Sequence, residues 1–449
     1  FAVLFEDNFN YLSKMCLLRM REAAFTMIRM ARERGYPVIV CGADASDHPG
    51  DYLNHGADYI LIGEGEQTLA ELLSALEAGR RPELDPESAP AGLAWRSSDR
   101  EDKVFRTPRR PDIKDLDRLP FPAWDLVDVE KYRAVWLDRH GYFSMNMVTT
   151  RGCPYHCNWC AKPIWGQRYN SRSPDNVVQE MVWLKDTFQP DHIWFADDIF
   201  GLKPGWIPKF ASLVQKSGSI MPFKCLSRVD LLLREGEIEA LKVAGAEIVW
   251  VGAESGAQKI LTAMEKGTRV EQIYTASREL RRAGVQVGFF LQFGYPGETR
   301  EDIETTLQMV REIMPDDIGM SVSYPLPGTT FYNRVVGELG EKKNWYDSSD
   351  MAMMYEGPYK TDFYRQLHIV LHKEFRMRVH WQRLKVTAGH PARLSRSDLR
   401  NSAAIAYHWI TLPLARRKLD RLEQRSSDSV GPLGPGMSLE EASRPTPQN

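Results

Sequence analysis

Strand-like and helix-like hydrophobic patterns alternate along the first part of the chain. Runs of β-branched and aromatic residues over 1–5, 37–41 and 59–62 predict buried strands, and segments 12–34 and 67–78 repeat apolar residues at helical spacing. This strand–helix order indicates a parallel, doubly wound sheet. The first run has the pattern of a strand inside a domain rather than at its start. We therefore expect the N-terminal domain to be truncated in this sequence.

The alternation of strand and helix resumes near residue 143 and continues through six units. Amphipathic helical segments separate the strands, as in 175–188, where Ser173 caps the helix and Pro174 occupies its first position. The predicted strands are 144–149, 192–195, 223–227, 248–252, 285–293 and 318–323. Six units on one sheet predict an α/β fold with an open, partial (βα)6 TIM-like barrel. Functional residues should then gather at the carboxyl ends of its strands.

These patterns divide the chain into five predicted parts. Residues 1–96 form a Rossmann-like domain, residues 97–140, dense in Ser, Asp, Arg and Pro, form a linker, and residues 141–330 form the barrel. Residues 331–424 are mainly helical and basic and form a C-terminal cap. Residues 425–449 are rich in Ser, Pro and Gly and have little to bury, which predicts a disordered tail.

Composition and charge narrow the class of protein further. The 449 residues are 43% hydrophobic and 26% charged, as in ordinary soluble globular proteins. Lys and Arg number 58 against 60 Asp and Glu, so the formal net charge is −2 and we expect no large surface for nucleic acid. We find no apolar run of membrane-spanning length and no secretory signal, which favours the cytoplasm.

Three of the six cysteines lie within eight residues, directly after the first strand of the predicted barrel. Cys153, Cys157 and Cys160 follow Gly152, whose lack of a side chain allows the backbone to approach closely. Three thiolates at this spacing can hold three corners of a cubane iron–sulfur cluster and leave the fourth iron open for chemistry. A zinc site is one alternative, but His156 is poorly placed as the fourth ligand. Inert buried cysteines are another.

The cysteine segment, with Trp159 before its last cysteine, resembles the motif of the radical S-adenosylmethionine (SAM) superfamily. The resemblance covers residues 143–330. It implies an enzyme with a 4Fe-4S cluster, whose open iron binds the amine and carboxylate of SAM. It also implies reductive cleavage of SAM to a 5′-deoxyadenosyl radical, with the electron supplied by an external donor such as flavodoxin or ferredoxin.

Two further strand ends of the predicted barrel match this family. Asp197 and Asp198 follow the second strand, where the family carries its amine-binding motif, and we expect one of the two acids to bind the amine of SAM. A turn or a helix cap is the common alternative role for such acids. Arg228 follows the third strand and is expected either to face the SAM carboxylate or to form a surface salt bridge.

The fourth and fifth strand ends also resemble motifs of the family. In the Gly-x-Glu-Ser-Gly motif at 252–256, the resemblance implies that Glu254 binds ribose hydroxyls or the amine of SAM. We assign Ser255 to the same cofactor site, although Ser followed by Gly also suits the start of a helix. Gly294 and Pro296 follow the fifth strand, where backbone contacts adenine in the family, and are assigned to the cofactor as well.

The end of the N-terminal domain is similar to cobalamin-binding domains that are fused to such barrels. The similarity lies in Gly63 and Glu64 after the third strand, and in Cys41 and Gly42, where the family has a glycine-rich loop. It implies that these four residues contact cobalamin at the carboxyl edge of the sheet. The alternative is a Rossmann-like domain that binds nothing or serves as a docking module.

The resemblance implies methylation of an unactivated carbon, with cobalamin supplying the methyl group. The alternatives are radical cyclisation or rearrangement, as in relatives of the anaerobic chlorophyll-ring cyclase, and a non-enzymatic electron carrier. We expect a small or lipid-like substrate. Segment 410–417 joins apolar residues to Arg416 and Arg417, which is compatible with contact with a membrane surface.

Overall fold

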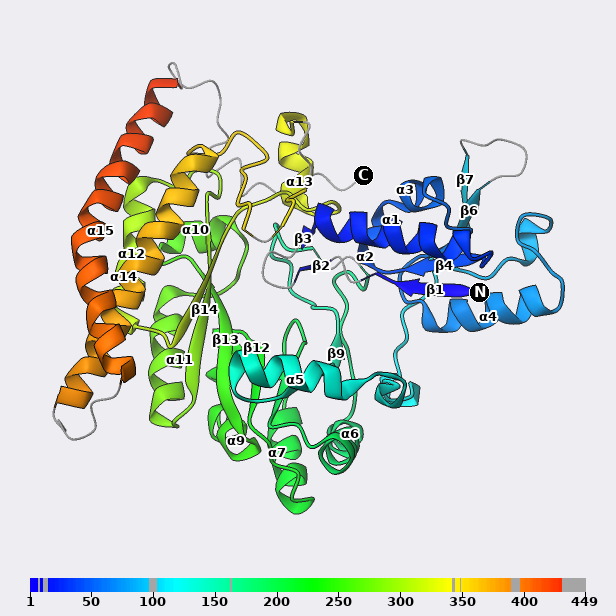
Figure 1. Ribbon diagram of the computed structural model, residues 1–449, viewed down its shortest axis with the longest axis horizontal. Coiled ribbons are helices and arrows are strands. Elements are labelled where there is room, and N and C mark those ends of the chain that lie inside the picture. Colours follow the sequence, from blue (N-terminus) through cyan, green and yellow to red (C-terminus); the bar gives the residue numbers. More distant parts are fainter. Residues whose placement is uncertain are drawn as a thin grey trace.

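The structure of the protein is a computed structural model that describes residues 1–6, 9–10, 15–96, 103–161, 164–340, 344–347, 349–388 and 396–429. A five-stranded sheet, a six-stranded sheet and a pair of long C-terminal helices dominate the described fold. The five-stranded sheet and the long helices lie at opposite ends of the molecule, with the six-stranded sheet between them (Figure 1). Mixed α/β architecture with parallel strands is therefore observed, as predicted.

The five-stranded sheet has the order β1-β4-β5-β6-β7. Its strands are β1 (Ala2–Phe5), β4 (Val38–Cys41), β5 (Tyr59–Leu61), β6 (Leu93–Arg96) and β7 (Val104–Arg106). The first three are parallel, and β6 and β7 extend the sheet in antiparallel directions. The sheet therefore reaches beyond residue 96, and the linker predicted over 97–140 is wrong at its start. Pairing with β6 stabilises the short strand β7, which shows little hydrophobic pattern of its own.

Four helices and a short 3-10 turn connect these strands. They are α1 (Leu18–Glu33), α2 (Ala43–Asp47), α3 (Pro49–Asn54), α4 (Glu66–Glu77) and η1 (Pro86–Ser88). Helix α1 begins later than the pattern over 12–34 predicted, because β3 (Met15–Cys16) pairs with β2 (Phe9–Asn10) in a separate two-stranded sheet.

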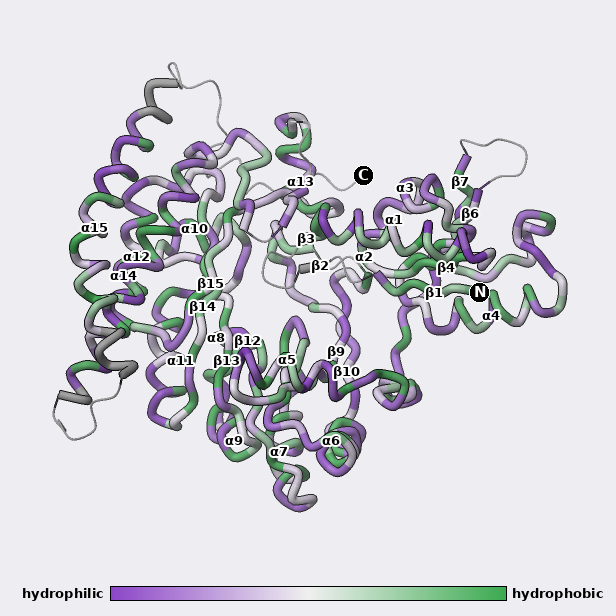
Figure 2. The backbone as a smooth tube through the Cα atoms, viewed as in Figure 1, coloured by the Kyte–Doolittle hydropathy of each residue, from purple (hydrophilic) through white to green (hydrophobic). Residues whose placement is uncertain are grey.

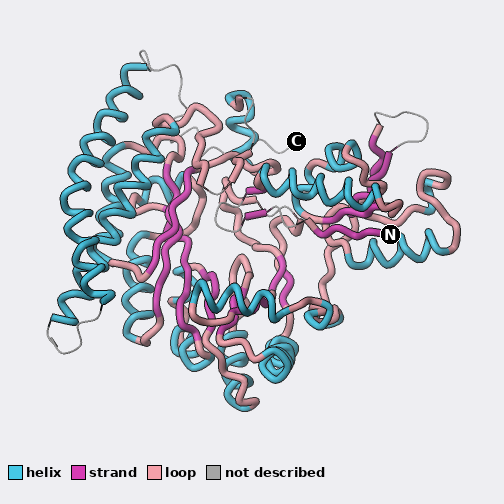
Figure 3. The backbone as a smooth tube through the Cα atoms, viewed as in Figure 1, coloured by secondary structure: helices cyan, strands magenta, loops and turns pink. Residues whose placement is uncertain are grey.

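The six-stranded sheet is parallel throughout and has the order β15-β14-β13-β12-β11-β8. Its strands are β8 (Ser144–Met147), β11 (His192–Phe195), β12 (Phe223–Ser227), β13 (Ala246–Glu254), β14 (Gln286–Phe293) and β15 (Asp317–Val322). All six lie where the hydrophobic runs predicted them. Their connections contain α6 (Pro174–Phe188), α7 (Trp206–Lys216), α8 (Val229–Leu232), α9 (Glu237–Ala244), α10 (Gln258–Ala263), α11 (Val270–Arg282) and α12 (Arg300–Ile313), which alternate with the strands along the chain (Figure 3).

The largest hydrophobic core joins the six-stranded sheet to its helices. Alternate strand residues such as Phe195, Phe223 and Val251 are fully buried in it. Hydrophobic stretches, drawn in green, occur in the strands of both sheets (Figure 2). Period-two burial of this kind fixes the register of the strands, and hence which residues stand at their carboxyl ends.

A segment with two 3-10 turns and one helix joins the two sheets. It contains η2 (Leu116–Arg118), η3 (Trp124–Leu126) and α5 (Val129–His140), which Asp128 caps at its N-terminus. Beyond β8, the short strand β9 (Thr150–Arg151) pairs with β10 (Asn170–Ser171) and begins the cysteine loop.

The C-terminal region is helical, as predicted. It contains α13 (Thr330–Val335), η4 (Val336–Glu338), α14 (Thr361–Ala388) and α15 (Arg396–Ser429), and α14 packs along α15 (Figure 1). Helix α15 includes the first five residues of the predicted disordered tail, and 430–449 lie outside the described residues. Among the described helices, none is both long and apolar enough to span a membrane.

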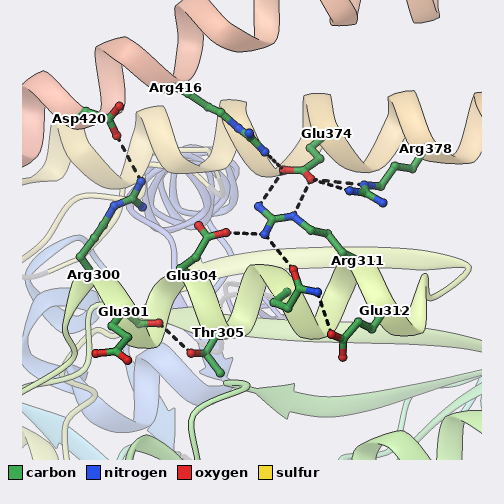
Figure 4. Close-up of polar contacts among 11 residues, drawn as sticks. Arg300, Glu301, Glu304, Thr305, Arg311, Glu312, Glu374, Arg378, Arg416 and Asp420 are labelled. Carbon is green, nitrogen blue, oxygen red and sulfur yellow. Dashed lines mark hydrogen bonds and ion pairs between the residues drawn. The ribbon is translucent and has the colours of Figure 1, made fainter.

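Ion pairs attach the two long helices to α12. Glu374 of α14 accepts hydrogen bonds from Arg311 of α12 (2.6 Å) and from Arg416 of α15 (2.7 Å), so one carboxylate joins three helices (Figure 4). Arg300 at the start of α12 pairs with Asp420 (3.4 Å). The helical pair is therefore fixed to the six-stranded sheet by charge as well as by packing.

Candidate functional site

The cysteine loop leaves the carboxyl end of β8 and is packed tightly from its first turn. Gly152 has a φ of +78°, and a Cβ atom at this position would lie 2.3 Å from the backbone oxygen of Arg168. Only glycine fits here without displacing the backbone. Cys153 and Cys157 are buried, and Cys160 is half-buried. None of the six cysteines forms a disulfide.

Asn158, between the second and third cysteines, fixes the middle of this loop. Its side-chain nitrogen donates to the backbone oxygen of Ala263 (2.8 Å), and its side-chain oxygen accepts from the Tyr295 hydroxyl (3.0 Å). Its backbone donates to the oxygen of Met264 and accepts from Phe331. The residue is buried, so these contacts hold the cysteine loop against β14 and against the turn after α10. Spacing alone did not identify Asn158.

Two buried cations lie beside the cysteine loop. The guanidinium of Arg228 lies 3.6 Å from the ring centre of Tyr155, pairs with Asp230 and donates to the backbone oxygen of Lys266 (2.9 Å). Burial opposes the charge of Lys266, but Glu254 and the nearby Cys157 raise its pKa above the ordinary value, so it stays protonated. Positive charge beside Cys157 complements the negative charge of an iron–sulfur cluster. Arg228 thus has protein partners that define its position.

Of the two acids after β11, Asp197 acts within the protein. Its carboxylate accepts hydrogen bonds from the backbone nitrogens of Thr149 (2.7 Å) and Thr150 (2.9 Å), and from the Thr149 hydroxyl (2.5 Å). Burial raises its pKa to about 6, although these hydrogen bonds oppose the rise. Asp197 therefore fixes the start of the cysteine loop, and the binding of the SAM amine by one of the two acids stays a prediction. Asp198 is half-buried at the same strand end.

Glu254 ends β13 in an unusual backbone conformation and in a buried ion pair. A β-bulge separates Gly252 from Glu254, whose φ is +56°, in the left-handed region that side chains rarely occupy. Its carboxylate lies 2.7 Å from the Lys266 amine, and both side chains are buried. Gly252 leaves room for this pair, because a Cβ atom there would lie 2.5 Å from each charged group.

Ser255 does not share the environment of Glu254. Its hydroxyl lies 3.1 Å from the Thr306 hydroxyl and accepts from the backbone nitrogen of Ala257, and the residue is fully buried against α12. Gly256 approaches α12 so closely that a Cβ atom would lie 2.8 Å from the backbone oxygen of Thr305. Ser255 thus joins the strand end to α12, and its assignment to the cofactor stays a prediction.

Gly294 and Pro296 form a turn at the end of β14. The φ of Gly294 is +82°; its nitrogen donates to Glu298 (2.6 Å) and its oxygen accepts from the Tyr355 hydroxyl. Burial raises the pKa of Glu298 to about 8, and one of its carboxylate oxygens has no hydrogen-bond partner among the described residues. Both polar groups of Gly294 are thus fixed by the protein, which sets the orientation of this turn.

At the carboxyl edge of the five-stranded sheet, glycines occupy the loops that follow β4 and β5. Cys41 and Leu61 pair across the ends of β4 and β5, so Gly42 and Gly63 follow neighbouring strands. Their φ angles are +145° and +81°. Behind Gly42, Glu6 lies so close that a Cβ atom would be 2.3 Å from its carboxylate. The structure thus brings together three of the four residues assigned to cobalamin.

Glu64, the fourth of these residues, connects the two sheets. Its carboxylate accepts hydrogen bonds from Arg151 (2.7 Å), from the Trp165 indole (3.0 Å) and from the backbone of Ile113 (2.5 Å). Arg151 stands two residues before Cys153 and also pairs with Glu66. The edge of the first sheet is therefore held directly against the cysteine loop. Arg151 was missed because the sequence gives no sign of which residue crosses between sheets.

The three cysteine thiols have the donor chemistry of an iron–sulfur cluster. In a cubane cluster, each thiolate binds a different iron. Soft thiolate donors, the neighbouring Lys266 and Arg228, and the Trp159 indole nitrogen all fit an anionic sulfide-containing group. That indole nitrogen is buried and has no hydrogen-bond partner among the described residues.

A cysteine loop after the first strand of a parallel sheet, with charged groups at the following strand ends, is the arrangement expected of an iron–sulfur site that binds SAM. Residues 147–310 match the family described as the radical SAM superfamily, so the chain contains a radical SAM domain.

Named relatives agree with this family. An uncharacterised methyltransferase of Pyrococcus horikoshii is 30% identical over 301 residues, which cover 66% of this chain and 62% of that protein. The anaerobic magnesium-protoporphyrin IX monomethyl ester cyclase of Rubrivivax gelatinosus is 29% identical over 65% of this chain and 50% of its own. The chain thus spans between half and two thirds of the length of these relatives.

A solved structure shows the same fold. It is the radical SAM methyltransferase TsrM from Kitasatospora setae with cobalamin and a [4Fe-4S] cluster bound. The TM-score is 0.62 at 20% sequence identity, and the match covers 75% of this chain and 66% of that one.

Proposed function

We propose that this protein is a cobalamin-dependent radical SAM methyltransferase that methylates an unactivated carbon of a small molecule. The observation that carries the proposal is the contact between the two sheets, where Arg151 of the cysteine loop binds Glu64 of the glycine-lined edge. This contact brings a site suited to an iron–sulfur cluster and an edge suited to a large planar cofactor to the same place.

In this proposal, Cys153, Cys157 and Cys160 hold a 4Fe-4S cluster, and Asn158 fixes their loop. Asp198 and the Glu254–Lys266 pair supply charges for the amine, carboxylate and ribose of SAM, and the turn of Gly294 and Pro296 offers backbone to adenine. Their positions at the ends of β11, β13 and β14 support this, because the carboxyl ends of parallel strands meet at one edge.

We assign cobalamin to the edge formed by Cys41, Gly42 and Gly63. Glycine backbone lets a flat ring approach a sheet edge closely. We further propose that the six strands curve as a partial (βα)6 barrel and that residues 1–106, rather than 1–96, form the cobalamin-binding unit.

With all groups bound, the cluster and SAM supply a 5′-deoxyadenosyl radical, and cobalamin supplies a methyl group. The chain's own contribution is to position and shield these groups. One face of the six-stranded sheet carries Trp250 stacked on Phe290 (4.8 Å between ring centres) and Lys224 placed 4.0 Å from the ring of Trp194. We propose that the substrate lies on this aromatic face, and that an external flavodoxin or ferredoxin in the cytoplasm supplies the electron.

Radical cyclisation without methyl transfer is the second candidate, favoured by the 29% identity to the Rubrivivax cyclase. The two reactions leave different products of SAM. Methyl transfer from SAM leaves S-adenosylhomocysteine, and radical cleavage leaves 5′-deoxyadenosine. A cobalamin-dependent methylation should therefore form both products, whereas a cyclisation should form only the second.

The test is anaerobic reconstitution of the chain with iron, sulfide and hydroxocobalamin, followed by reduction in the presence of SAM. Bound iron and cobalt together with both SAM products would support the methyltransferase. Bound iron with 5′-deoxyadenosine alone and no cobalt would support the cyclase. A chain that binds no cluster would contradict both.

A further inference from the structure

Helix α15 presents an apolar face to solvent. Over 403–414 the sequence contains no charged residue, and Tyr407, Trp409, Ile410 and Leu414 are between 58% and 72% exposed. The opposite face, with Leu412 and Leu419, is buried. Single exposed apolar residues are ordinary, but a continuous apolar stripe of this kind marks a binding surface. Within the described part of the chain, nothing covers it.

A groove between α15, α14 and the ends of α11 and α12 adjoins this face. Its volume is about 770 Å³, and its lining includes Arg281, Arg378, Lys385, Trp381 and Trp409. Trp409 belongs both to the groove and to the exposed face, and Trp381 is 50% exposed. Amphipathic aromatic rings beside cations are typical of side chains that sit at the level of lipid headgroups.

Two stretches of the long helices are strongly basic, although the whole chain is not. Over 373–385 and 402–421 they carry nine basic residues and two acids. The basic residues are Lys373, Arg376, Arg378, Arg383, Lys385, Arg416, Arg417, Lys418 and Arg421, and the acids are Glu374 and Asp420. The chain as a whole has a net charge of −2. Both acids are already engaged, Glu374 by three arginines and Asp420 by Arg300 (Figure 4).

The cations are arranged around the apolar stripe. Lys373 lies 4.5 Å from the ring centre of Tyr407, and its amine donates to Thr411 (2.8 Å). Along α15, Tyr407, Ile410 and Leu414 recur at spacings of three and four, and the same face continues to Arg417 and Arg421. An apolar stripe that ends in exposed arginines is the pattern of a helix that lies in a membrane interface.

We propose that α15, with the adjoining groove, docks the protein on the surface of a bilayer that contains anionic lipid. Ile410, Leu414 and Trp409 would enter the boundary between headgroups and acyl chains, and Arg417, Arg421 and Lys385 would face the headgroups. The helix would lie on the membrane rather than cross it, consistent with the absence of a spanning helix among the described residues. This proposal is independent of the reaction proposed above.

A second copy of the chain fits this face less well than an anionic surface. Residues 403–418 of α15 contain no acid, so an identical helix packed against the stripe offers no partner for Arg417. Charge complementarity therefore selects lipid phosphate over self-association.

The test is sedimentation of the full chain with vesicles of phosphatidylcholine alone and of phosphatidylcholine mixed with phosphatidylglycerol. We expect binding only to the mixed vesicles, reduced by added salt and accompanied by a blue shift of tryptophan fluorescence. Leu414→Glu should weaken binding by about tenfold or more, because burial of one such side chain changes affinity by at least that factor. Leu126→Glu, at a leucine that is 83% exposed and distant in the sequence, is the matched control and should bind as the unaltered protein does.

Three results would overturn the proposal. One is the absence of binding to the mixed vesicles, and another is binding that Leu414→Glu leaves unchanged while thermal melting shows both variants folded. The third is a dimer in light scattering that Leu414→Glu dissociates, which would assign the face to a second copy. Loss of the preference for anionic vesicles in the Arg417→Glu/Arg421→Glu variant would establish the part played by charge.

Discussion

The carboxyl edges of the two sheets are built in different ways. At the edge of the five-stranded sheet, glycines such as Gly42 and Gly63 form the loops after the strands. The side-chain contacts there join the helices, as in the pair of Arg21 in α1 with Asp44 in α2 (2.6 Å). At the edge of the six-stranded sheet, side chains such as Asn158 and Lys266 are bonded into the cysteine loop and the strand ends. A flat ligand needs an open, smooth edge, whereas a cluster needs thiolates held in fixed positions.

The largest expected effect is at the edge that holds the thiolates. We expect Cys157→Ser to abolish formation of 5′-deoxyadenosine, by more than about a hundredfold, because one iron loses its thiolate ligand. Cys16→Ser, at a half-buried cysteine outside the cluster motif, is the control and should retain both iron and turnover. Equal activity of the two variants, measured by chromatography of the SAM products, would remove the cysteine loop from the mechanism.

Gly252→Ala tests the buried ion pair at the same edge. The added methyl group must displace Glu254 and Lys266, whose charged atoms lie 2.5 Å from its position. These are the ends of flexible side chains, so we expect little change in melting temperature but about tenfold weaker SAM binding. Gly337→Ala, where the added atom meets nothing within 4 Å, is the control. Unchanged SAM affinity in equilibrium dialysis would exclude the pair from the cofactor site.

Arg151→Ala tests whether the two edges work together. It leaves Glu64 buried without its charge partner, so we expect a loss of stability of about 3 kcal/mol. Methyl transfer should fall several-fold more than 5′-deoxyadenosine formation, because only the first reaction needs both edges. The added substitution Glu64→Gln should recover stability but not methyl transfer. A parallel fall of both products would show that the contact is only structural.

Glu298→Gln should change the reaction least, and its effect should be visible in the pH dependence of stability. Burial raises the pKa of the native carboxyl from 4.5 to about 8, whereas the unfolded chain releases this proton near 4.5. Between these values the native state binds more protons, so rising pH favours unfolding, by at most about 5 kcal/mol. Chemical denaturation from pH 5 to pH 8 should show this loss in the unaltered protein and less of it in the variant. Equal slopes would contradict the buried, protonated carboxyl.

The sequence predicted secondary structure well where a regular pattern of apolar residues extends through the whole element. All six strands of the second sheet lie where the pattern of apolar residues placed them, because burial determines both pattern and register. Strand β7 and the late start of α1 were not predictable, because both depend on pairing with distant segments. Local periodicity carries no information about such partners.

In the candidate site, the positions of residues at the strand ends were predictable, but the partners of their side chains were not. Cysteine spacing and strand ends located the thiols, Glu254 and the turn of Gly294. The direction of each side chain was not predictable, and so Asp197, Ser255 and Glu64 proved to bind protein groups. Asn158 and Arg151, which flank the cysteines, carry no motif that sets them apart. Their roles depend on partners that only the fold brings near.

We propose above all that Cys153, Cys157 and Cys160 hold a 4Fe-4S cluster with one iron open to SAM. The most direct measurement is the electron paramagnetic resonance spectrum of the reconstituted, dithionite-reduced protein, recorded before and after addition of SAM. We expect a reduced 4Fe-4S signal that changes when SAM is added, because the amine and carboxylate of SAM would bind the open iron. A cluster signal that SAM leaves unchanged, or the absence of any cluster, would contradict it.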